Sequence, residues 1–418
     1  MTAATAVWDV LLGIAILGVC SSTVFLLMVL VAATRWVREA RAARKVALAT
    51  PEASLPAVTI FKPVHGMEAQ LEENLESFFQ QDYPAFEVIV GARDSSDAGL
   101  QVAERVRQRH PQVKSRIVVS GPPTWPNAKV FSLSKMIPLS TNDYFVISDS
   151  DVRVSPDFLR DVIPAVLDKD NLDKEDEDKK IGLVTCPYRG VPAGDFWSTL
   201  EALGMSVEMP SGVMVADMLE GIRFALGPAV ALRRDGLEKI GGIAATADYY
   251  SDDFVLGNLI WAAGYKVIFS HHIVQHVLTP RSLKRTLGDQ LRWMKSTRFS
   301  RPLGHVGTGL TYAVPFGVLG LVAGAATSHV ALGVGLFAMA FLNRVVQSVA
   351  VGWGAIGDRR ALYLSFLYPV RDFLGFLTWA GSFSSRTFFW RGETYRFSKG
   401  GRIIPQNRPA ESAVGAKL

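Results

Sequence analysis

The chain opens with a long apolar run. Residues 10–33 carry no charged side chain, and this stretch is long enough to cross a bilayer as a helix. Basic residues follow the run rather than precede it, and the run is too long for a signal peptide. We therefore expect an uncleaved signal-anchor over residues 1–35. By the positive-inside rule, the basic segment at residues 36–55 places the next domain of the chain in the cytoplasm.

The middle of the chain alternates between strand and helix patterns. Short apolar runs end at or near residues 64, 94, 120 and 148, and helix-like segments separate the first three. Such alternation predicts βαβ units and a mostly parallel sheet, with ligands beyond the carboxyl ends of the strands. We expect residues 56–279 to form one cytoplasmic α/β domain with a Rossmann-like sheet.

The pattern changes again beyond residue 279. Residues 280–302 mix Leu, Trp and Met with basic residues at near-helical spacing, which is typical of an amphipathic interfacial helix. Within the C-terminal transmembrane region, residues 303–384, the runs 306–326 and 330–352 predict a membrane hairpin. A third segment at 362–383 is weaker, because it contains a proline, an arginine and an aspartate. For the basic tail at residues 385–418 we favour the cytoplasmic side.

Composition supports this division. Hydrophobic residues make up 49% of the chain, and its mean hydropathy is +0.20, with the excess at the two ends. The net charge is +5, but the basic residues are not interleaved with aromatics, so we expect no nucleic-acid partner. Two cysteines support neither a disulfide framework nor a thiolate metal site. The charged run at residues 168–180 predicts a solvated loop.

Asp149 and Asp151 follow an apolar strand directly. Carboxylates at that position suit a hard divalent cation such as Mg²⁺ or Mn²⁺, which would neutralise the leaving diphosphate of a nucleotide-sugar donor. The alternative is a pair of surface aspartates that caps a helix. The strand-end position, with Asp94 at another strand end, favours the metal site.

Three further residues are candidates for the nucleotide. Asp94 could accept hydrogen bonds from the base or ribose, although it could also cap a turn. Lys62 and Lys129 could contact the phosphates, or could be surface lysines. Lys62 lies within an apolar strand, where a charge is costly without a partner.

Asp252 and Asp253 form an acidic pair before an apolar helix. Repulsion between adjacent carboxylates raises proton affinity, so one could be a general base; a helix-capping pair fits equally well. Arg292 and Trp293 could meet a phosphate and stack on a ring, or could anchor the interfacial helix.

The remaining basic aromatic and histidine patterns are less specific. WRGETYR (390–396) is a membrane-interface anchor or a phosphate contact. Histidines occur at positions 271, 272 and 276 in a strand-like stretch, where neighbouring side chains point to opposite faces. We do not expect these histidines to form a metal cluster.

Taken together and in order, these motifs resemble the ceramide glucosyltransferase family of inverting GT-A glycosyltransferases, related to bacterial hopanoid glycosyltransferases. The resemblance covers nearly the whole chain, including PNAK (126–129), SDSDVRVSPDFL (148–159), GPAVALRRDGLEKIGG (227–242), YYSDDF (249–254) and DQLRW (289–293). It implies a GT-A fold between N-terminal and C-terminal transmembrane helices.

The resemblance also implies roles. Asp94 matches the nucleotide-base motif, Asp149 and Asp151 the metal and pyrophosphate motif, and Asp253 the catalytic base. Arg292 and Trp293 match the end of the (Q/R)xxRW motif. One position departs: Asp289 stands where the family has Gln or Arg, so no role is carried onto it.

The implied reaction transfers glucose from UDP-glucose to the primary hydroxyl of ceramide, with inversion and a divalent metal. A hopanoid acceptor with UDP-N-acetylglucosamine shares the same motifs and stays open. A noncatalytic nucleotide-binding membrane protein is the alternative of another class. We expect an integral membrane protein of a bacterial inner membrane.

Overall fold

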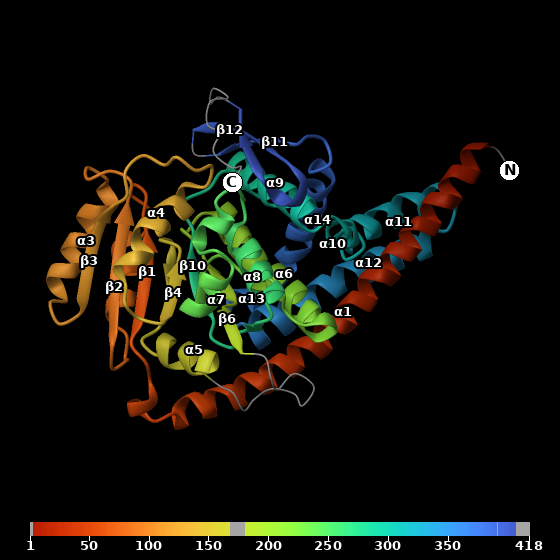
Figure 1. Ribbon diagram of the computed structural model, residues 1–418. Helices are drawn as coiled ribbons and strands as arrows, with labels where there is room; N and C mark the ends of the chain where they lie inside the picture. Colours follow the sequence, from red (N-terminus) through yellow and green to blue (C-terminus); the bar gives the residue numbers. More distant parts are fainter. Residues whose placement is uncertain (1–2, 168–179, 391, 407–418) are drawn as a thin grey trace.

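A seven-stranded sheet forms the centre of the α/β domain (Figure 1). The computed structural model describes residues 3–167, 180–390 and 392–406. The strand order is β3-β2-β1-β4-β8-β6-β9. The strands are β1 Val58–Pro63, β2 Phe86–Ala92, β3 Lys114–Val119, β4 Tyr144–Ser148, β6 Ile181–Thr185, β8 Ala229–Arg233 and β9 Lys266–Phe269.

Strand β8 is antiparallel to both β4 and β6, whereas the other neighbouring pairs are parallel. The predicted mostly parallel α/β fold is therefore confirmed. The central strands β1 and β4 are buried on both faces, which explains their continuous apolar runs, whereas the edge strand β3 is partly exposed.

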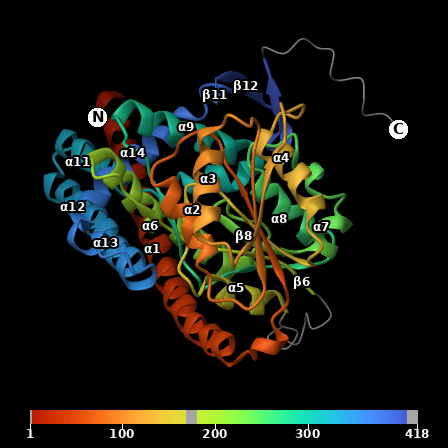
Figure 2. The ribbon, with the colours of Figure 1, turned by 90° about the vertical axis from the view of Figure 1, so that its left-hand side faces the viewer.

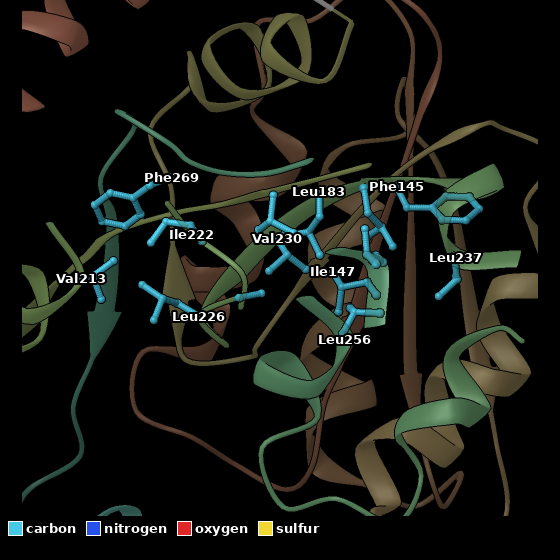
Figure 3. Packing of buried hydrophobic residues seen from close by; sticks show 14 of the residues in the cluster. Phe145, Ile147, Leu183, Val213, Ile222, Leu226, Val230, Leu237, Leu256 and Phe269 are labelled. Atoms are coloured by element: carbon cyan, nitrogen blue, oxygen red, sulfur yellow. The ribbon is translucent and has the colours of Figure 1, made fainter. Parts of the chain in front are cut away.

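Helices cover the two faces of the sheet (Figure 2). On β1, Ile60 packs with α2, α3 and α5, while its neighbour Phe61 belongs to the core with α4, α7 and α8. Figure 3 shows part of this second core, including Phe145 and Leu256. The helices are α2 Leu71–Phe79, α3 Ala98–Arg109, α4 Ala128–Met136, α5 Phe158–Leu167, α6 Phe196–Glu220, α7 Arg234–Lys239 and α8 Asp252–Ala262.

Two small sheets flank the main one. In the first, β10 pairs antiparallel with β5 and parallel with β7. The second is the antiparallel C-terminal sheet of the chain, in the order β11-β12-β13. The strands are β5 Val152–Arg153, β7 Tyr188–Val191, β10 Val274–Val277, β11 Thr387–Trp390, β12 Glu393–Phe397 and β13 Ile403–Pro405.

The N-terminal helix α1 (Ala3–Ala49) has 47 residues and extends well beyond the α/β domain (Figure 1). Its first half packs against α11 (Val314–Ala326) and α12 (Val330–Gln347). The structure differs from the expected linker at residues 36–55, because the helix continues through the basic segment to Ala49. Trp36 is buried against the main core, which explains why the chain stays helical there.

Two helical segments are long and apolar enough to cross a membrane, namely Ala6–Ala49 and Val330–Ala355. The second comprises α12 and a π-helical turn, Ser348–Ala355. Helix α11 is apolar but shorter. It packs closely on α12: a Cβ added to Gly324 would lie 2.9 Å from the Cα of Gly333.

The weak third segment forms two short helices, α13 (Arg360–Tyr363) and α14 (Tyr368–Gly381). Its charged residues are buried and paired. Arg371 contacts Glu208 of α6 at 3.0 Å, and Asp372 contacts Arg344 of α12 at 3.4 Å. Asp372 also accepts hydrogen bonds from two backbone N–H groups at the start of α11, so it caps that helix.

The interfacial segment is helical as expected, with α9 (Leu283–Ser300) followed by α10 (Pro302–Thr308). After α14 the chain returns to the α/β domain: the backbone N–H of Ile403 donates to the carbonyl of Asp248 at 2.8 Å. Figure 1 shows the C-terminal sheet beside α9. The expected charged loop at residues 168–180, apart from Lys180, and the last part of the tail lie outside the described residues.

Candidate active site

The candidate residues gather at the carboxyl ends of β1 and β4, where the strand order changes direction. Lys62 of β1 is fully buried. Its Nζ donates to Ser148 Oγ at 3.3 Å and to the backbone carbonyl of Asp149, and it lies 4.0 Å from the centre of the Phe78 ring. Burial lowers the pKa of Lys62 to about 7, although Asp149 and Asp151 oppose the shift. Through these hydrogen bonds Lys62 fixes the backbone at the start of the Asp149–Asp151 motif.

Lys129 joins the two acidic motifs. Its Nζ lies 2.7 Å from Asp149 Oδ1 and 3.3 Å from Asp252 Oδ2. Burial alone would lower the pKa of Lys129, but Asp149, Asp252 and Asp253 outweigh it and raise the pKa. Lys129 is thus a partly buried cation shared between two carboxylates.

Asn127 positions this lysine, and sequence reasoning assigned it no role. Its side chain caps α4 by accepting hydrogen bonds from the N–H groups of Lys129 and Val130. Its amide then donates to Asp252 Oδ1 at 3.1 Å. An Asn at a helix N-cap is a recognisable signal, but its second contact joins residues 125 positions apart.

Asp151 lies beside a histidine from a distant strand. His276 Nε2 is 3.3 Å from Asp151 Oδ2, and the backbone N–H of Val277 donates to the Asp151 carbonyl at 2.8 Å. Burial would raise the pKa of Asp151, but His276 outweighs it and lowers the pKa. His271 and His272 point elsewhere, toward Glu39 and Asp161. The three histidines therefore share no site among the described residues, yet one of them supports the acidic motif.

Asp253 faces Asp149 across Gly227. A Cβ placed on Gly227 would lie 3.0 Å from Asp253 Oδ2 and 3.5 Å from Asp149 Oδ2. Burial, together with the neighbouring Asp252, raises the pKa of Asp253 to about 7, against the opposing charge of Lys129. A glycine at this point keeps the space between the two carboxylates open.

The acidic pair begins α8 rather than capping it. Ser251 precedes the helix, and both aspartates lie in its first turn without a side-chain capping bond at that N-cap. Carboxylates there are favoured by the helix dipole, and Asp252 is further held by Asn127 and Lys129. Asp253 remains directed at the site.

Helix α9 is tied to the loop that precedes Asp253. Arg292 Nε donates to Tyr250 Oη at 2.6 Å, and the hydroxyls of Ser251 and Ser296 lie 2.8 Å apart. Trp293 packs with Tyr188 against buried residues of α6. The RW pair therefore contacts the loop before Asp253 and helix α6, and its role in the site stays a prediction.

Asp289, the position that departs from the motif, forms ion pairs with two arginines. Its carboxylate lies 3.0 Å from Arg292 Nη2 and 2.6 Å from Arg281 Nη1. The displaced Gln290 instead turns inward and donates to Glu201 of α6. Asp289 thus orients Arg292, which is a role that the motif comparison alone did not provide.

Asp94 stands apart from the other candidates. It follows β2 and is exposed, and its side chain accepts hydrogen bonds from the N–H and Oγ of Ser96. These bonds, led by the backbone N–H, lower the pKa of Asp94. Its position next to β1 suits a nucleotide contact, but its observed contacts are those of a turn, so its role stays a prediction.

The site has the charge and the ligand atoms that a hard cation requires. Four carboxylates, at positions 149, 151, 252 and 253, face two lysines. Asp151 Oδ1 is buried and has no hydrogen-bond partner among the described residues. Free carboxylate oxygens in a net negative site fit Mg²⁺ or Mn²⁺.

A second acidic cluster is separate from this edge. Asp157, Asp161 and His272 have ligand atoms within 4.8 Å of one another. They already form a partnered group, because His272 Nδ1 lies 2.8 Å from Asp161 and Arg44 lies 3.5 Å from Asp157. This cluster joins α5 to the basic end of α1.

An α/β domain with paired acidic motifs at its strand ends, carried on apolar helices, defines a glycosyltransferase of the GT-A class. The family can be stated more closely. The sequence profile "Glycosyl transferase family 21" matches residues 16–403, and the chain belongs to this family.

Curated relatives agree with the family. Ceramide glucosyltransferase 1 of Caenorhabditis elegans is 23% identical over 360 residues, which cover 84% of this chain and 74% of the relative. Ceramide glucosyltransferase of Komagataella phaffii is 38% identical over 101 residues, covering 23% and 20%. The resemblance expected from the motifs is confirmed.

Among solved structures, the mannosyltransferase PcManGT from Pyrobaculum calidifontis, in complex with GDP-Man and Mn²⁺, matches with a TM-score of 0.49 and 19% identity. The match covers 88% of this chain and 99% of that one.

Proposed function

We propose that this chain transfers glucose from UDP-glucose to the primary hydroxyl of ceramide, with inversion at the anomeric carbon and a divalent metal. The observation that carries the proposal is the pair of carboxylates, Asp253 and Asp149, that face each other across Gly227. The names of the curated relatives support ceramide as acceptor. The apolar helices support a membrane location, for which we propose a bacterial inner membrane with the catalytic domain in the cytoplasm.

The proposed roles follow from position. Asp149 and Asp151 would hold the metal, which supplies charge neutralisation to the departing diphosphate. Asp253 accepts the proton of the acceptor hydroxyl. That oxygen then bonds to the anomeric carbon as the bond to the UDP oxygen breaks. A base with a pKa near 7 is suited to this step at neutral pH.

Other residues would bind the donor. Arg292, oriented by Asp289 and Tyr250, is a candidate for the diphosphate, and Trp293 for the wall of the sugar site. Asp94 is the candidate for the uracil or ribose. Lys62 and Lys129 act by holding the acidic motifs in place.

The test is UDP release by the detergent-purified protein, with UDP-glucose and ceramide, with and without EDTA. Asp253→Asn should abolish turnover. Asp143→Asn is the matched control, because the side chain of Asp143 is 81% exposed on the far side of β4. Metal-dependent turnover with ceramide supports the proposal. Turnover only with a hopanoid polyol and UDP-N-acetylglucosamine would show that these are the substrates in place of ceramide and UDP-glucose. No turnover with any lipid would refute the proposed transferase activity.

A further inference from the structure

Helix α6 runs from the active-site wall to the apolar helices, and one of its faces is polar. Glu201, Gly204 and Glu208 lie three and four positions apart, so they share that face. Arg371 of α14 lies across Gly204, where a Cβ would collide with its Nε. Arg371 Nη2 pairs with Glu208 at 3.0 Å. The catalytic domain and the C-terminal helices are therefore joined here by buried charges.

Three polar groups in this cluster have no hydrogen-bond partner among the described residues. They are Glu201 Oε2, Arg371 Nε and the hydroxyl of Tyr312. The residues are 0%, 4% and 3% exposed, respectively. Tyr312 Oη and Arg371 Nη1 both lie close to Gly375, at 3.5 and 3.2 Å from the position of a Cβ there. Buried polar groups in native proteins are nearly always paired, so these three groups are available to hydrogen-bond a polar ligand.

The cluster lies beside the wall of the active site, because Gln290 of α9 donates a hydrogen bond to Glu201. Burial raises the pKa of Tyr188, and the charges of Asp253, Glu201 and Glu208 add to that shift. The Tyr188 ring lies 5.8 Å from that of His276, beside the acidic motif. At the other end the side chain of Glu208 is 29% exposed. The cluster therefore lies between the wall of the active site and a partly exposed carboxylate.

We propose that Glu201, Arg371 and Tyr312 bind the polar head of the lipid acceptor, an inference that rests on the proposed function. The free oxygen of Glu201 accepts a hydrogen bond, whereas Arg371 Nε and the Tyr312 hydroxyl donate. The ligand must therefore present a donor and an acceptor close together, as a hydroxyl beside an amide or a second hydroxyl does. The surrounding charges are Glu201, Glu208 and Asp372 against Arg371 and Arg344, so the cluster is net negative and disfavours an anionic head. An uncharged lipid head is therefore the expected ligand.

The first variant is Tyr312→Phe, which removes only the unpartnered hydroxyl. One lost neutral hydrogen bond should raise the KM for ceramide about two- to tenfold. The KM for UDP-glucose and the slow hydrolysis of UDP-glucose without lipid should not change. Glu201→Gln keeps the shape of the side chain but removes its charge, and should raise the ceramide KM about ten- to a hundredfold.

The matched control is Tyr83→Phe. Tyr83 is also buried, at 7% exposure, but its hydroxyl donates to the Pro56 carbonyl at 2.8 Å, far from α6. This control should lower the melting temperature and leave the ceramide KM unchanged. Tyr312→Phe should instead raise the ceramide KM without lowering the melting temperature.

Binding of radiolabelled ceramide without donor separates the two proposals. Weaker binding by both cluster variants than by the control supports the cluster. Equal binding and equal KM in all variants would overturn it, even if transfer to ceramide occurs. A wild-type protein that hydrolyses UDP-glucose but glucosylates no lipid would instead overturn the proposed function.

Discussion

The rate of transfer should depend on pH through Asp253. Burial and the charge of Asp252 raise the pKa of Asp253 to about 7, and a general base acts in its ionised form. The rate should therefore be near its plateau at pH 8, about half of it at pH 7 and about a tenth at pH 6. An aspartate with an ordinary pKa would give a flat profile over this range.

Asp252→Asn tests the cause of this shift. The substitution removes a like charge beside Asp253, so the pKa of Asp253 should fall and the acid limb should move to lower pH. Asp252 is partly neutralised by Lys129 at 3.3 Å, so we expect a shift of about one pKa unit, or about 1.4 kcal/mol of repulsion. At pH 6 the variant should then retain about half of its own plateau, against about a tenth for the wild type.

The same shift has a consequence for stability. Asp253 holds its proton more tightly in the folded state than in the unfolded state, so stability falls as the pH rises from about 4 to 7. Asp253→Asn should abolish transfer and raise the free energy of unfolding at pH 8 by on the order of 2 kcal/mol in the absence of metal. At pH 4 the variant and the wild type should be equally stable.

The assay is UDP release between pH 5.5 and 8.5 at saturating UDP-glucose and ceramide. Each profile is repeated with tenfold more metal, because the metal site also loses affinity in acid. An acid limb that moves with metal concentration belongs to the metal ligands. A flat profile, or a limb that Asp252→Asn leaves in place, would refute the assignment of Asp253 as a base tuned by burial and its neighbour.

Three further predictions concern the site and its support. Gly227→Ala places a methyl group between the base and the metal motif, and should lower kcat about tenfold or more without unfolding, which turnover and circular dichroism together would show. His276→Gln loosens Asp151 and should raise the metal concentration for half-maximal activity at least about tenfold; an unchanged metal titration would contradict this. Asp372→Asn leaves Arg344 buried without its counter-charge and should cost about 3 kcal/mol or more, measured as detergent thermal stability.

Local sequence patterns predicted the parts of the site that lie on single strands. The sequence placed Lys62 within one apolar strand and Asp149 directly after another, and the structure has both strands at those positions, as β1 and β4. That these two strands are neighbours in the sheet was not predicted. The placement of Lys129 between Asp149 and Asp252 could not be predicted in this way. It depends on the contact between the N-terminus of α4 and the start of α8, which lies more than 100 residues later in the chain. A local sequence pattern cannot predict such a long-range contact.

The boundaries of the membrane region show the same limit. Hydropathy located the N-terminal span, but it placed the end of the helix too early, because charged residues at positions 38–45 were read as linker. In the structure they extend the helix along α5 and contact the acidic surface there, as Arg44 does with Asp157. Arg371 and Asp372 weakened the prediction of the third membrane segment for a related reason. Hydropathy counts each charge as unpaired, whereas both residues are neutralised by partners on other helices.

Asp289 illustrates why a motif should be judged by its contacts. By pattern it is a defect in (Q/R)xxRW, since an acid cannot donate the hydrogen bonds of Gln or Arg. In the structure it lies between Arg281 and Arg292 and fixes the guanidinium that reaches Tyr250 beside the catalytic loop. An Arg at position 289 would face the like charges of Arg281 and Arg292. An Asp at this position is therefore compatible with the presence of Arg281. The orientation of Arg292, and with it the donor contact that we propose for it, therefore involves residues 281 and 289 together, and neither can be interpreted without the other.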